Sequence, residues 1–532
     1  MLDHNKKAQD DPSQKELKFI LELFNSNKLL EANKEVDKQL IKYSKSAILY
    51  NILGAIFARQ YKLKDALLNY NKSLKINPKY FQAYNNLGAC FYEMGKIDEA
   101  IQNYKKAIEI KPNHADAHNN LGVTFKAIKN YEKSIFHYKK ALEINPSSPI
   151  TFSNIGNVYR LLGDYEKAIN YHKKAIQINP NYAEAYSNLG VSFQLTNEIE
   201  KALEYFDKAL EIDPDFSEAQ HNKSLLMLLN SDFEKGFNKY EWRKKILSVD
   251  FYKKNTPKTQ EWTGEDLTNK TILIIAEQGV GDVIQFSRYI YIIKENYSAK
   301  IIFKVQKKLA HLFSNSGIEI ISEEDKIPEH DHHIFLMSLP KIFYSKKKSL
   351  PKQINYIAKN ENIFLKWKKK LGKINGIKVG INWQGNSSYF GDRLRSIPLS
   401  FFETLFTVEK INFINLQKGI GAEQIKNFKY KDKLYDFSSE VDNGKNAFED
   451  TIGILNNIDL VISSDTALPH LSGTLGIKTW VMVPFIPDWR YFLKTDYSPW
   501  YEHMKIYRNE KSNNWNKVFD KVKKNLINEF ND

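Results

Sequence analysis

The sequence has one cysteine in 532 residues, and this scarcity excludes a framework of intramolecular disulfides. A single thiol fits a reducing compartment, and we expect Cys90 to be an inert core residue. No apolar run approaches the ~18 residues that span a bilayer, and the polar N-terminal stretch lacks the apolar segment of a signal peptide. These absences predict a cytoplasmic protein without a transmembrane segment.

The sequence also lacks a concentrated basic block. Its formal net charge of +15 comes mostly from lysines that are spread over the whole length. A nucleic-acid surface needs basic residues gathered on one face, so we expect no nucleic-acid partner. Hydrophobic residues make up 42% of the chain and aromatic residues 13%, which is ample for globular cores. The length predicts about two to four domains.

The first half of the chain repeats itself every 34 residues. Two residue types mark the period: the prolines Pro78, Pro112, Pro146, Pro180 and Pro214, and the glycines Gly54, Gly88, Gly122, Gly156 and Gly190. A glycine allows two helices to approach closely, and a proline ends the second helix where the chain turns. This period and residue set resemble the tetratricopeptide repeat. We therefore expect about seven helical hairpins forming a right-handed superhelix over residues 13–250.

Asparagine recurs at one phase of these repeats, two residues before the glycine position. The five residues are Asn86, Asn120, Asn154, Asn188 and Asn222. Asparagine is a mediocre helix former, so its recurrence suggests a ladder along the concave groove. The array resembles that of O-linked N-acetylglucosamine transferase, where such asparagines hold the main chain of a peptide. The resemblance implies a protein or peptide in the groove; the alternative is that asparagine is simply a common polar choice in this chain.

The pattern changes after residues 251–269, which we expect to be a linker. An apolar, β-branched run, Ile272–Ile275, predicts a buried strand, and a glycine turn, Glu277–Asp282, leads from it into a helix. Such a turn aims unpaired N–H groups and a positive dipole end at its surroundings, which suits an anion. It lacks the Gly-Lys-Ser/Thr of a P-loop and the third glycine of GxGxxG. A simple capping role for Asp282 is the alternative.

Strands and helices then alternate to the end of the chain, which predicts doubly wound parallel sheets. We expect two Rossmann-like lobes, residues 270–370 and 371–532, with a ligand cleft between the carboxyl ends of their strands. The histidine-rich run at residues 329–333 has the residue types of a metal site. Its five residues are consecutive, however, so their side chains diverge, and we expect a polar loop.

Eight pieces of this half, in order, resemble the heptosyltransferase-like glycosyltransferases (family 9) of GT-B fold, and most of all a bacterial branch with N-terminal tetratricopeptide repeats. They are EQGVGDVIQFSRY, a strand closing in SLP, VGINWQGN, DRLRSIPL, NLQKG, DLVISSDTALPHLSGTLG, PDWRYF and SPWY. The resemblance spans nearly all of residues 271–530. The sequence departs from the family motif at Pro469, in the first turn of a helix, where proline is tolerated.

The resemblance implies a role for each matched residue. Asp282 would be the general base that takes the proton of the acceptor hydroxyl. Contacts to the nucleotide sugar would come from Gly279, Gly281, Arg393, Arg395, Glu423, Asp465, Thr466 and His470. Backbone N–H groups at the second helix N-terminus would stabilise the departing diphosphate. The family works without a metal or cofactor, and attack opposite the leaving group would invert the sugar.

Each of these roles has a structural alternative. Asp465 is also suited to be an N-cap, His470 to satisfy a neighbouring carbonyl, and the two arginines to be solvated loop charges. The sequence thus predicts a glycosyltransferase that moves a sugar from a nucleotide-sugar donor to an acceptor, with a protein as the leading acceptor. A catalytically inactive interaction scaffold and a transferase acting on lipopolysaccharide or glycolipid precursors are the alternatives. The base and sugar of the donor are not visible in these motifs.

Overall fold

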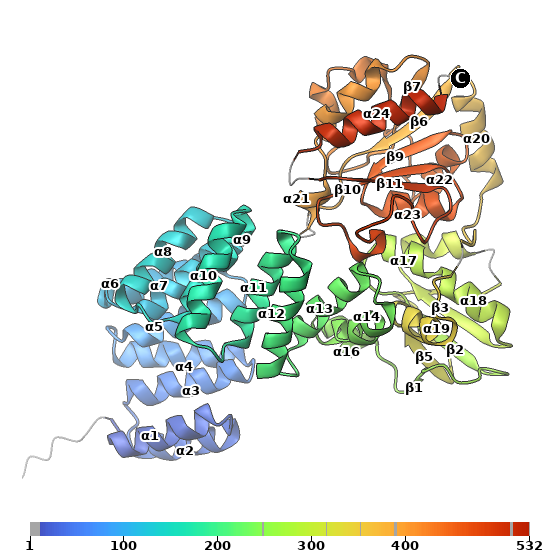
Figure 1. Ribbon diagram of the computed structural model, residues 1–532. Coiled ribbons are helices and arrows are strands. Elements are labelled where there is room, and N and C mark those ends of the chain that lie inside the picture. Colours follow the sequence, from blue (N-terminus) through green and yellow to red (C-terminus); the bar gives the residue numbers. More distant parts are fainter. Residues whose placement is uncertain are drawn as a thin grey trace, which may run out of the picture. The chain divides into compact units, whose positions relative to one another are not determined.

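The chain forms two compact units, Met1–Pro214 and Asp215–Asp532 (Figure 1). The structure is a computed structural model, and it describes residues 11–246, 249–314, 317–351, 353–387, 391–510 and 514–530. No helix in these ranges is both long and apolar enough to cross a membrane.

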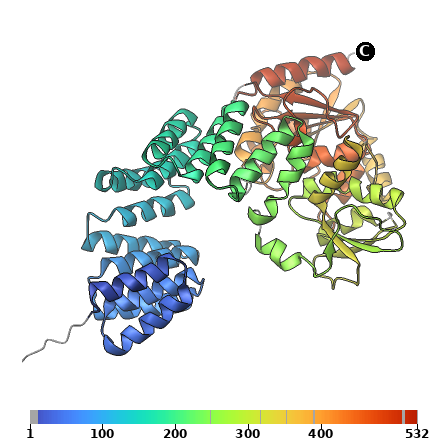
Figure 2. The same ribbon diagram turned by 60° about the horizontal axis from the view of Figure 1, so that its bottom comes forward.

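The first unit is built from helical hairpins, seen in blue to green in Figure 2. Its helices are α1 (Gln14–Asn25), α2 (Leu29–Lys42), α3 (Ala47–Arg59), α4 (Leu63–Ile76), α5 (Phe81–Glu93), α6 (Ile97–Ile110), α7 (Ala115–Ala127), α8 (Tyr131–Ile144), α9 (Pro149–Leu162), α10 (Tyr165–Ile178), α11 (Ala183–Leu195) and α12 (Ile199–Ile212). Each odd-numbered helix packs against the even-numbered helix that follows it. The hairpins follow the 34-residue period of the sequence.

The recurring glycines lie where the two helices of a hairpin touch. A Cβ atom at Gly122 would lie 2.5 Å from the ring of Tyr138, so only glycine fits without a shift of the neighbour. The same contact joins Gly54 to Tyr70, Gly88 to Tyr104, Gly156 to His172 and Gly190 to Phe206. His172 is thus the one member of this series in which a histidine takes the place of a carbocyclic aromatic ring.

The second unit begins with helices, α13 (Ser217–Leu229), α14 (Phe233–Tyr240), α15 (Arg243–Ile246) and α16 (Val249–Asn255). A first sheet follows, made of β1 (Gln260–Glu261), β2 (Thr271–Ile275), β3 (Lys300–Val305), β4 (Glu319–Ser322) and β5 (His332–Phe335). Its order is β1-β5-β2-β3-β4, and all its strand pairs are parallel. Its helical segments are α17 (Val280–Phe286), α18 (Arg288–Asn296), η1 (Lys307–Phe313), η2 (Leu336–Ser338) and α19 (Leu339–Lys347).

Two segments of this lobe differ from their sequence-based interpretation. Residues 251–269, interpreted as a linker, contribute strand β1 and the buried Trp262 to the sheet domain. The compact unit also begins at Asp215, ahead of residue 250, where the repeats were expected to end. The second difference arises because helices α13 and α14 pack against the sheet domains, through η6 and α19.

The histidine-rich run at residues 329–333 is built into the edge of this sheet. The ring nitrogens of His330 and His333 lie 3.0 and 3.1 Å from the hydroxyl of Thr259. The carboxylate of Asp331 accepts a hydrogen bond from the backbone N–H of Thr271 at 2.7 Å. These side chains therefore join the segments around β1, β2 and β5.

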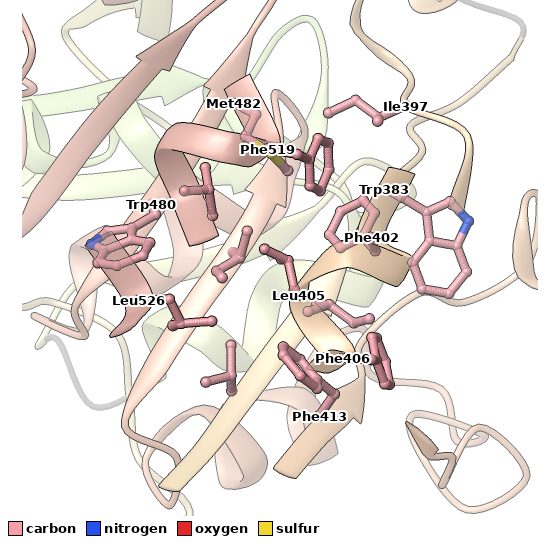
Figure 3. Packing of buried hydrophobic residues seen from close by; sticks show 14 of the residues in the cluster. Trp383, Ile397, Phe402, Leu405, Phe406, Phe413, Trp480, Met482, Phe519 and Leu526 are labelled. Carbon is pink, nitrogen blue, oxygen red and sulfur yellow. The ribbon is translucent and has the colours of Figure 1, made fainter. Parts of the chain in front are cut away.

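The second sheet contains β6 (Ile377–Asn382), β7 (Ile411–Asn415), β8 (Leu434–Tyr435), β9 (Leu460–Ser464), β10 (Thr479–Val483) and β11 (Met504–Arg508). Its helical segments are α20 (Glu361–Leu371), α21 (Asp392–Arg395), η3 (Leu399–Thr407), η4 (Ala422–Asn427), η5 (Lys431–Lys433), α22 (Glu449–Leu455), α23 (Ala467–Thr474), η6 (Trp489–Tyr491) and α24 (Asn516–Phe530). The parallel order β8-β7-β6-β9-β10-β11 is that of a dinucleotide-binding doubly wound sheet. Its core includes Trp383, Phe402 and Phe519 (Figure 3).

The strand orders locate the edge at which sheets of this kind bind ligands. In the first sheet the order reverses beside β2, and in the second it reverses beside β6. Ligands of such sheets bind at the carboxyl ends of the strands at this reversal. The Glu277–Asp282 turn follows β2, and Asp465 follows β9, the neighbour of β6. Both predicted motifs therefore lie at the points where the strand order reverses, which are called switch points.

Candidate functional site

Asp282 lies in the first turn of α17 and makes two polar contacts. One carboxylate oxygen accepts a hydrogen bond from the backbone N–H of Gly279 at 2.9 Å, so Asp282 caps its own helix. The other oxygen forms an ion pair with Arg490. Burial raises the pKa of the Asp282 carboxyl, and the positive charge of Arg490 opposes that shift. The capping alternative is thus present together with an ion pair that reaches the other lobe.

The second motif opens α23. Thr466 is the N-cap: its hydroxyl accepts from the N–H of Leu468 at 3.4 Å and donates to Asn382 at 3.1 Å. Asp465 is therefore not the capping residue, and its side chain is buried. Burial and the nearby charge of Asp488 raise the pKa of Asp465, while Arg395 opposes the shift.

The two motifs meet in space although about half of the unit separates them in sequence. A Cβ atom added at Gly281 would lie 3.1 Å from the imidazole of His470 and 3.4 Å from the Cα of Ala467. The first turns of α17 and α23 are therefore in contact, and the two helices lie side by side in Figure 1. The glycine at 281 permits this approach because it has no side chain.

His470 is buried in this contact. Its Nδ1 lies 3.3 Å from the Tyr501 hydroxyl, so its observed partner is a hydroxyl group rather than the carbonyl of the structural alternative. Burial, reinforced by the positive charges of Arg490, Arg288 and Arg395, holds the pKa of His470 well below its usual range. The imidazole is therefore neutral at pH 7, and it can act as a hydrogen-bonding group without adding charge.

Arg490 is the residue that sequence reasoning missed. Its guanidinium pairs with Asp282 and, at 2.7 Å, with Asp488, and it lies over the rings of Phe286 and Trp489. It is 7% exposed. The signal that marks it is its position in the matched piece PDWRYF, directly after β10 at the edge where ligands of the second sheet bind.

The remaining predicted residues lie in two short helical segments, α21 and η4. Arg395 is half-buried, pairs with Asp392 at 3.3 Å and acts electrostatically on Asp465. Arg393 is exposed. Glu423 is also exposed, and its carboxylate accepts from the backbone N–H of Gly421 at 2.8 Å, within its own turn. The structure therefore brings Asp282, Arg395, Asp465 and His470 into one electrostatic group, whereas Arg393 and Glu423 are exposed residues of short helical segments.

Several polar atoms in this part of the described chain are buried without a hydrogen-bond partner. They are the Ser464 hydroxyl, the Nε of Arg490 and the indole N–H of Trp489. Buried polar atoms are normally paired, and unpaired ones at a binding edge offer contacts to a polar ligand. Their positions, at the end of β9 and in the segment after β10, coincide with the switch-point edge.

Four of the five recurring asparagines form hydrogen bonds that link successive repeats of the first unit. The side-chain amide of Asn86 donates to Asn51 at 3.0 Å, and that of Asn120 donates to Asn85 at 3.0 Å. Asn154 and Asn188 make the corresponding bonds, to Asn119 at 3.3 Å and to Ser153 at 3.2 Å. Asn222 is half-buried on α13. An amide has two N–H donors and an acceptor oxygen, so one such bond leaves capacity for a further partner.

Comparison with known proteins identifies the repeats. A family model described as TPR repeat matches residues 54–95 and 90–129, and models described as tetratricopeptide repeat match residues 115–148 and 147–215. Residues 54–215 are tetratricopeptide repeats. Arrays of such repeats present extended concave surfaces that bind proteins or peptides, so the first unit is a protein-interaction module.

Individual proteins are similar over part of the chain. Protein FlbA of Caulobacter vibrioides is 24% identical over 283 residues, which are 49% of this chain and 47% of FlbA. The chain thus spans about half the length of the curated relative it matches. Among solved structures, the TPR protein YrrB is 25% identical with a TM-score of 0.29, covering 36% of this chain and 98% of YrrB. MamA is 26% identical with a TM-score of 0.28, covering 30% of this chain and 95% of MamA.

Proposed function

We propose that the second unit is a GT-B glycosyltransferase, which moves a sugar from a nucleotide-sugar donor to an acceptor, and that the repeats recruit a protein as that acceptor. The observation that carries the proposal is the meeting of two switch-point motifs, with Gly281 against His470 and Asp282 paired to Arg490. A carboxylate from one sheet domain and a helix N-terminus from the other are the two parts that sugar transfer needs.

The second sheet domain supplies the donor site in this proposal. The departing nucleoside diphosphate gains negative charge, which backbone N–H groups at the start of α23 and the cations Arg395 and Arg490 would stabilise. Three carboxylates, Asp282, Asp465 and Asp488, oppose an anion there. Burial raises the pKa of Asp465 to about 6, so an approaching anion that raises it further would favour the neutral carboxyl and reduce that repulsion.

Asp282 is the general base in this proposal, and Arg490 controls it. Without a donor, Arg490 neutralises the carboxylate and lowers its basicity. A diphosphate is a strong bidentate partner for a guanidinium, so an arriving donor would compete for Arg490. Asp282 would then be free to take the proton of an acceptor hydroxyl as that oxygen attacks the anomeric carbon. Donor binding before acceptor attack follows from this arrangement.

An interaction scaffold without turnover is the second candidate. The observation that favours it is that both oxygens of Asp282 are engaged, one by Gly279 and one by Arg490. A scaffold would keep these contacts permanently, whereas a transferase must release at least the arginine.

The two candidates differ in nucleotide binding. We expect one of the UDP-, GDP- or ADP-sugars to raise the thermal unfolding midpoint of the full-length protein, because a ligand that binds only the folded state stabilises it. Substitution Arg395→Gln should weaken that shift, and the exposed control Lys426→Gln should not. The absence of a shift with every nucleotide sugar contradicts the transferase and favours the scaffold.

A protein acceptor is tested separately. Co-expression of the full-length protein with its host proteins should add a hexose-like mass to at least one of them, as seen by intact-protein mass spectrometry. Donor turnover without any modified protein would instead direct attention to glycolipid or lipopolysaccharide precursors as acceptors.

A further inference from the structure

The helical hairpin α13–α14 contacts the Glu277–Asp282 turn and the segment around η6, which contains Arg490. Phe233 and Phe237 on α14 lie against Phe492 and Trp489, with ring centroids 5.4 and 5.9 Å apart. Tyr240, the last residue of α14, lies 6.2 Å from Trp489 and bonds through its hydroxyl to Gln278 at 3.1 Å. One hairpin thus supports both partners of the Asp282–Arg490 pair.

The charged side chain that follows α14 is wholly buried. Arg243 donates to Glu277 at 2.8 Å and to Ser338 at 2.9 Å, and the side chains of Arg243 and Glu277 are 0% and 1% exposed. The carboxylate of Glu277 also accepts from the N–H of Met337 at 2.8 Å and from the hydroxyl of Tyr252. Glu277 is the first residue of the turn that ends in Asp282.

The backbone of this turn needs such support. Gln278 has a φ of 63°, in the left-handed region that residues other than glycine enter only at a cost. Two side chains from outside the turn hold it on either side, since Arg243 binds Glu277 and Tyr240 binds Gln278. A buried ion pair adds little net stability, because desolvation costs roughly as much as the attraction returns. The contribution of the Arg243–Glu277 pair is therefore geometric, because it fixes the position of the turn that leads to Asp282.

We propose that Arg243, through its pair with Glu277, is a positioning residue for Asp282, and that hairpin α13–α14 is a working part of the transferase site rather than a terminal cap of the repeats. This inference rests on the proposed function of Asp282. It adds hairpin α13–α14, which lies outside the two sheets, to the site, and the role of the hairpin is to position Asp282.

Glu277 also contributes directly to the electrostatics of the base. The charged groups that act on Asp282 are Arg490, Asp488 and Glu277, and the phenol of Tyr240 faces the same carboxylate. The negative charge of Glu277 raises the pKa of Asp282, so its removal lowers that pKa. The shift of the kcat profile therefore reports the charge of Glu277, and the fall in kcat reports its positioning role.

The test compares two isosteric substitutions in the full-length protein, Glu277→Gln and Glu234→Gln. Glu234 lies on α14 and also bridges to the sheet domain, through an exposed pair with Lys348 at 2.7 Å. For Glu277→Gln we expect kcat to fall about 10²-fold, because displacement of a catalytic group by about 1 Å costs that much. The donor KM should change less than about threefold, and the acidic limb of the kcat profile should move to lower pH. Glu234→Gln should match the wild type in all three.

A second variant protects the test against misfolding, since Glu277→Gln removes one of the two carboxylates that pair with the buried Arg243 and leaves only Glu241. Arg243→Lys keeps the charge but loses the planar fork that binds two acceptors. We expect a thermal midpoint near that of the wild type and a kcat reduced about tenfold. Two results with an active wild type would overturn the inference but not the proposed function. One is an unchanged kcat in Arg243→Lys, and the other is a Glu277→Gln variant that behaves like Glu234→Gln. A wild type that neither binds nor turns over a nucleotide sugar overturns the proposed function, and the inference with it.

Discussion

At the scale of single residues, the side chain of Asp282 has two roles: it caps its own helix and it forms an ion pair with Arg490. The backbone contact to Gly279 fixes where the Asp282 carboxylate lies, and burial raises its pKa while the ion pair with Arg490 opposes that rise. In the proposed reaction the contact to Gly279 stays in place, whereas the diphosphate of the donor replaces Asp282 as the partner of Arg490. Structural and catalytic interpretations of Asp282 are therefore compatible.

His172 carries a separate prediction at the same scale. It is fully buried, neither ring nitrogen has a hydrogen-bond partner, and burial lowers its pKa to about 3. Below its unfolded pKa of 6.5 the unfolded chain therefore binds more protons than the folded one. The stability that neutral His172 provides is present above pH 6.5 and is lost as the pH falls.

The substitution His172→Phe should remove this acid sensitivity, because Phe206 fills the same repeat position against Gly190. Urea unfolding at pH 7 and pH 5 measures it. The loss of unfolding free energy between these two pH values should be smaller in the variant by about 2 kcal/mol. An equal loss in wild type and variant would show that other groups cause the acid sensitivity.

At the scale of elements, the repeats depend on close approach of two helices. Gly122→Ala places a methyl group 2.5 Å from the Tyr138 ring, and overpacking of this kind typically costs about 1–3 kcal/mol. Thermal unfolding of the full-length protein should show the loss. Gly444→Ala is the matched control, because nothing lies within 4 Å of the added methyl group. Equal midpoints for the two variants would contradict the packing account.

The sequence predicts elements better than it predicts contacts between them. The 34-residue spacing of Gly122, Pro146 and their equivalents indicates the repeats, and the family models confirm them. Alternating apolar runs indicate the strands of both parallel sheets. The Arg490–Asp282 contact joins residues 208 positions apart. No local pattern encodes such a pair, so Arg490 was found only in the structure.

The same limit applies to Arg243. Its residue type and its neighbours Trp242 and Lys244 look like an ordinary helix surface, and only its partner Glu277 shows that it is buried. The second helix N-terminus was partly predictable, but the capping alternative was assigned to Asp465, whereas Thr466 caps the helix. Both side chains suit an N-cap position, so residue type alone does not separate them. The roles of Asp282, Asp465 and His470 in a reaction stay predictions.

At the scale of the whole molecule, the division between the units predicts which fragments fold. A chain of residues 215–532 keeps α13 and α14, whereas a chain of residues 256–532 loses Phe237, Tyr240 and Arg243. The shorter fragment exposes Trp489 and leaves Glu277 as a buried carboxylate without its cation, which costs about 3–5 kcal/mol. We expect a cooperative thermal transition for residues 215–532 and none for residues 256–532. A cooperative transition of the shorter chain would show that the hairpin is dispensable.

Sugar transfer by the full-length protein tests the central claim most directly, through the release of nucleoside diphosphate from the donor identified by thermal shift. The account predicts that Asp282→Asn binds that donor as the wild type does but releases product at least about 10²-fold more slowly, because a general base typically contributes that much. Asp331→Asn, at the opposite end of β2, should release product at the wild-type rate. Release at the wild-type rate by Asp282→Asn would contradict the account.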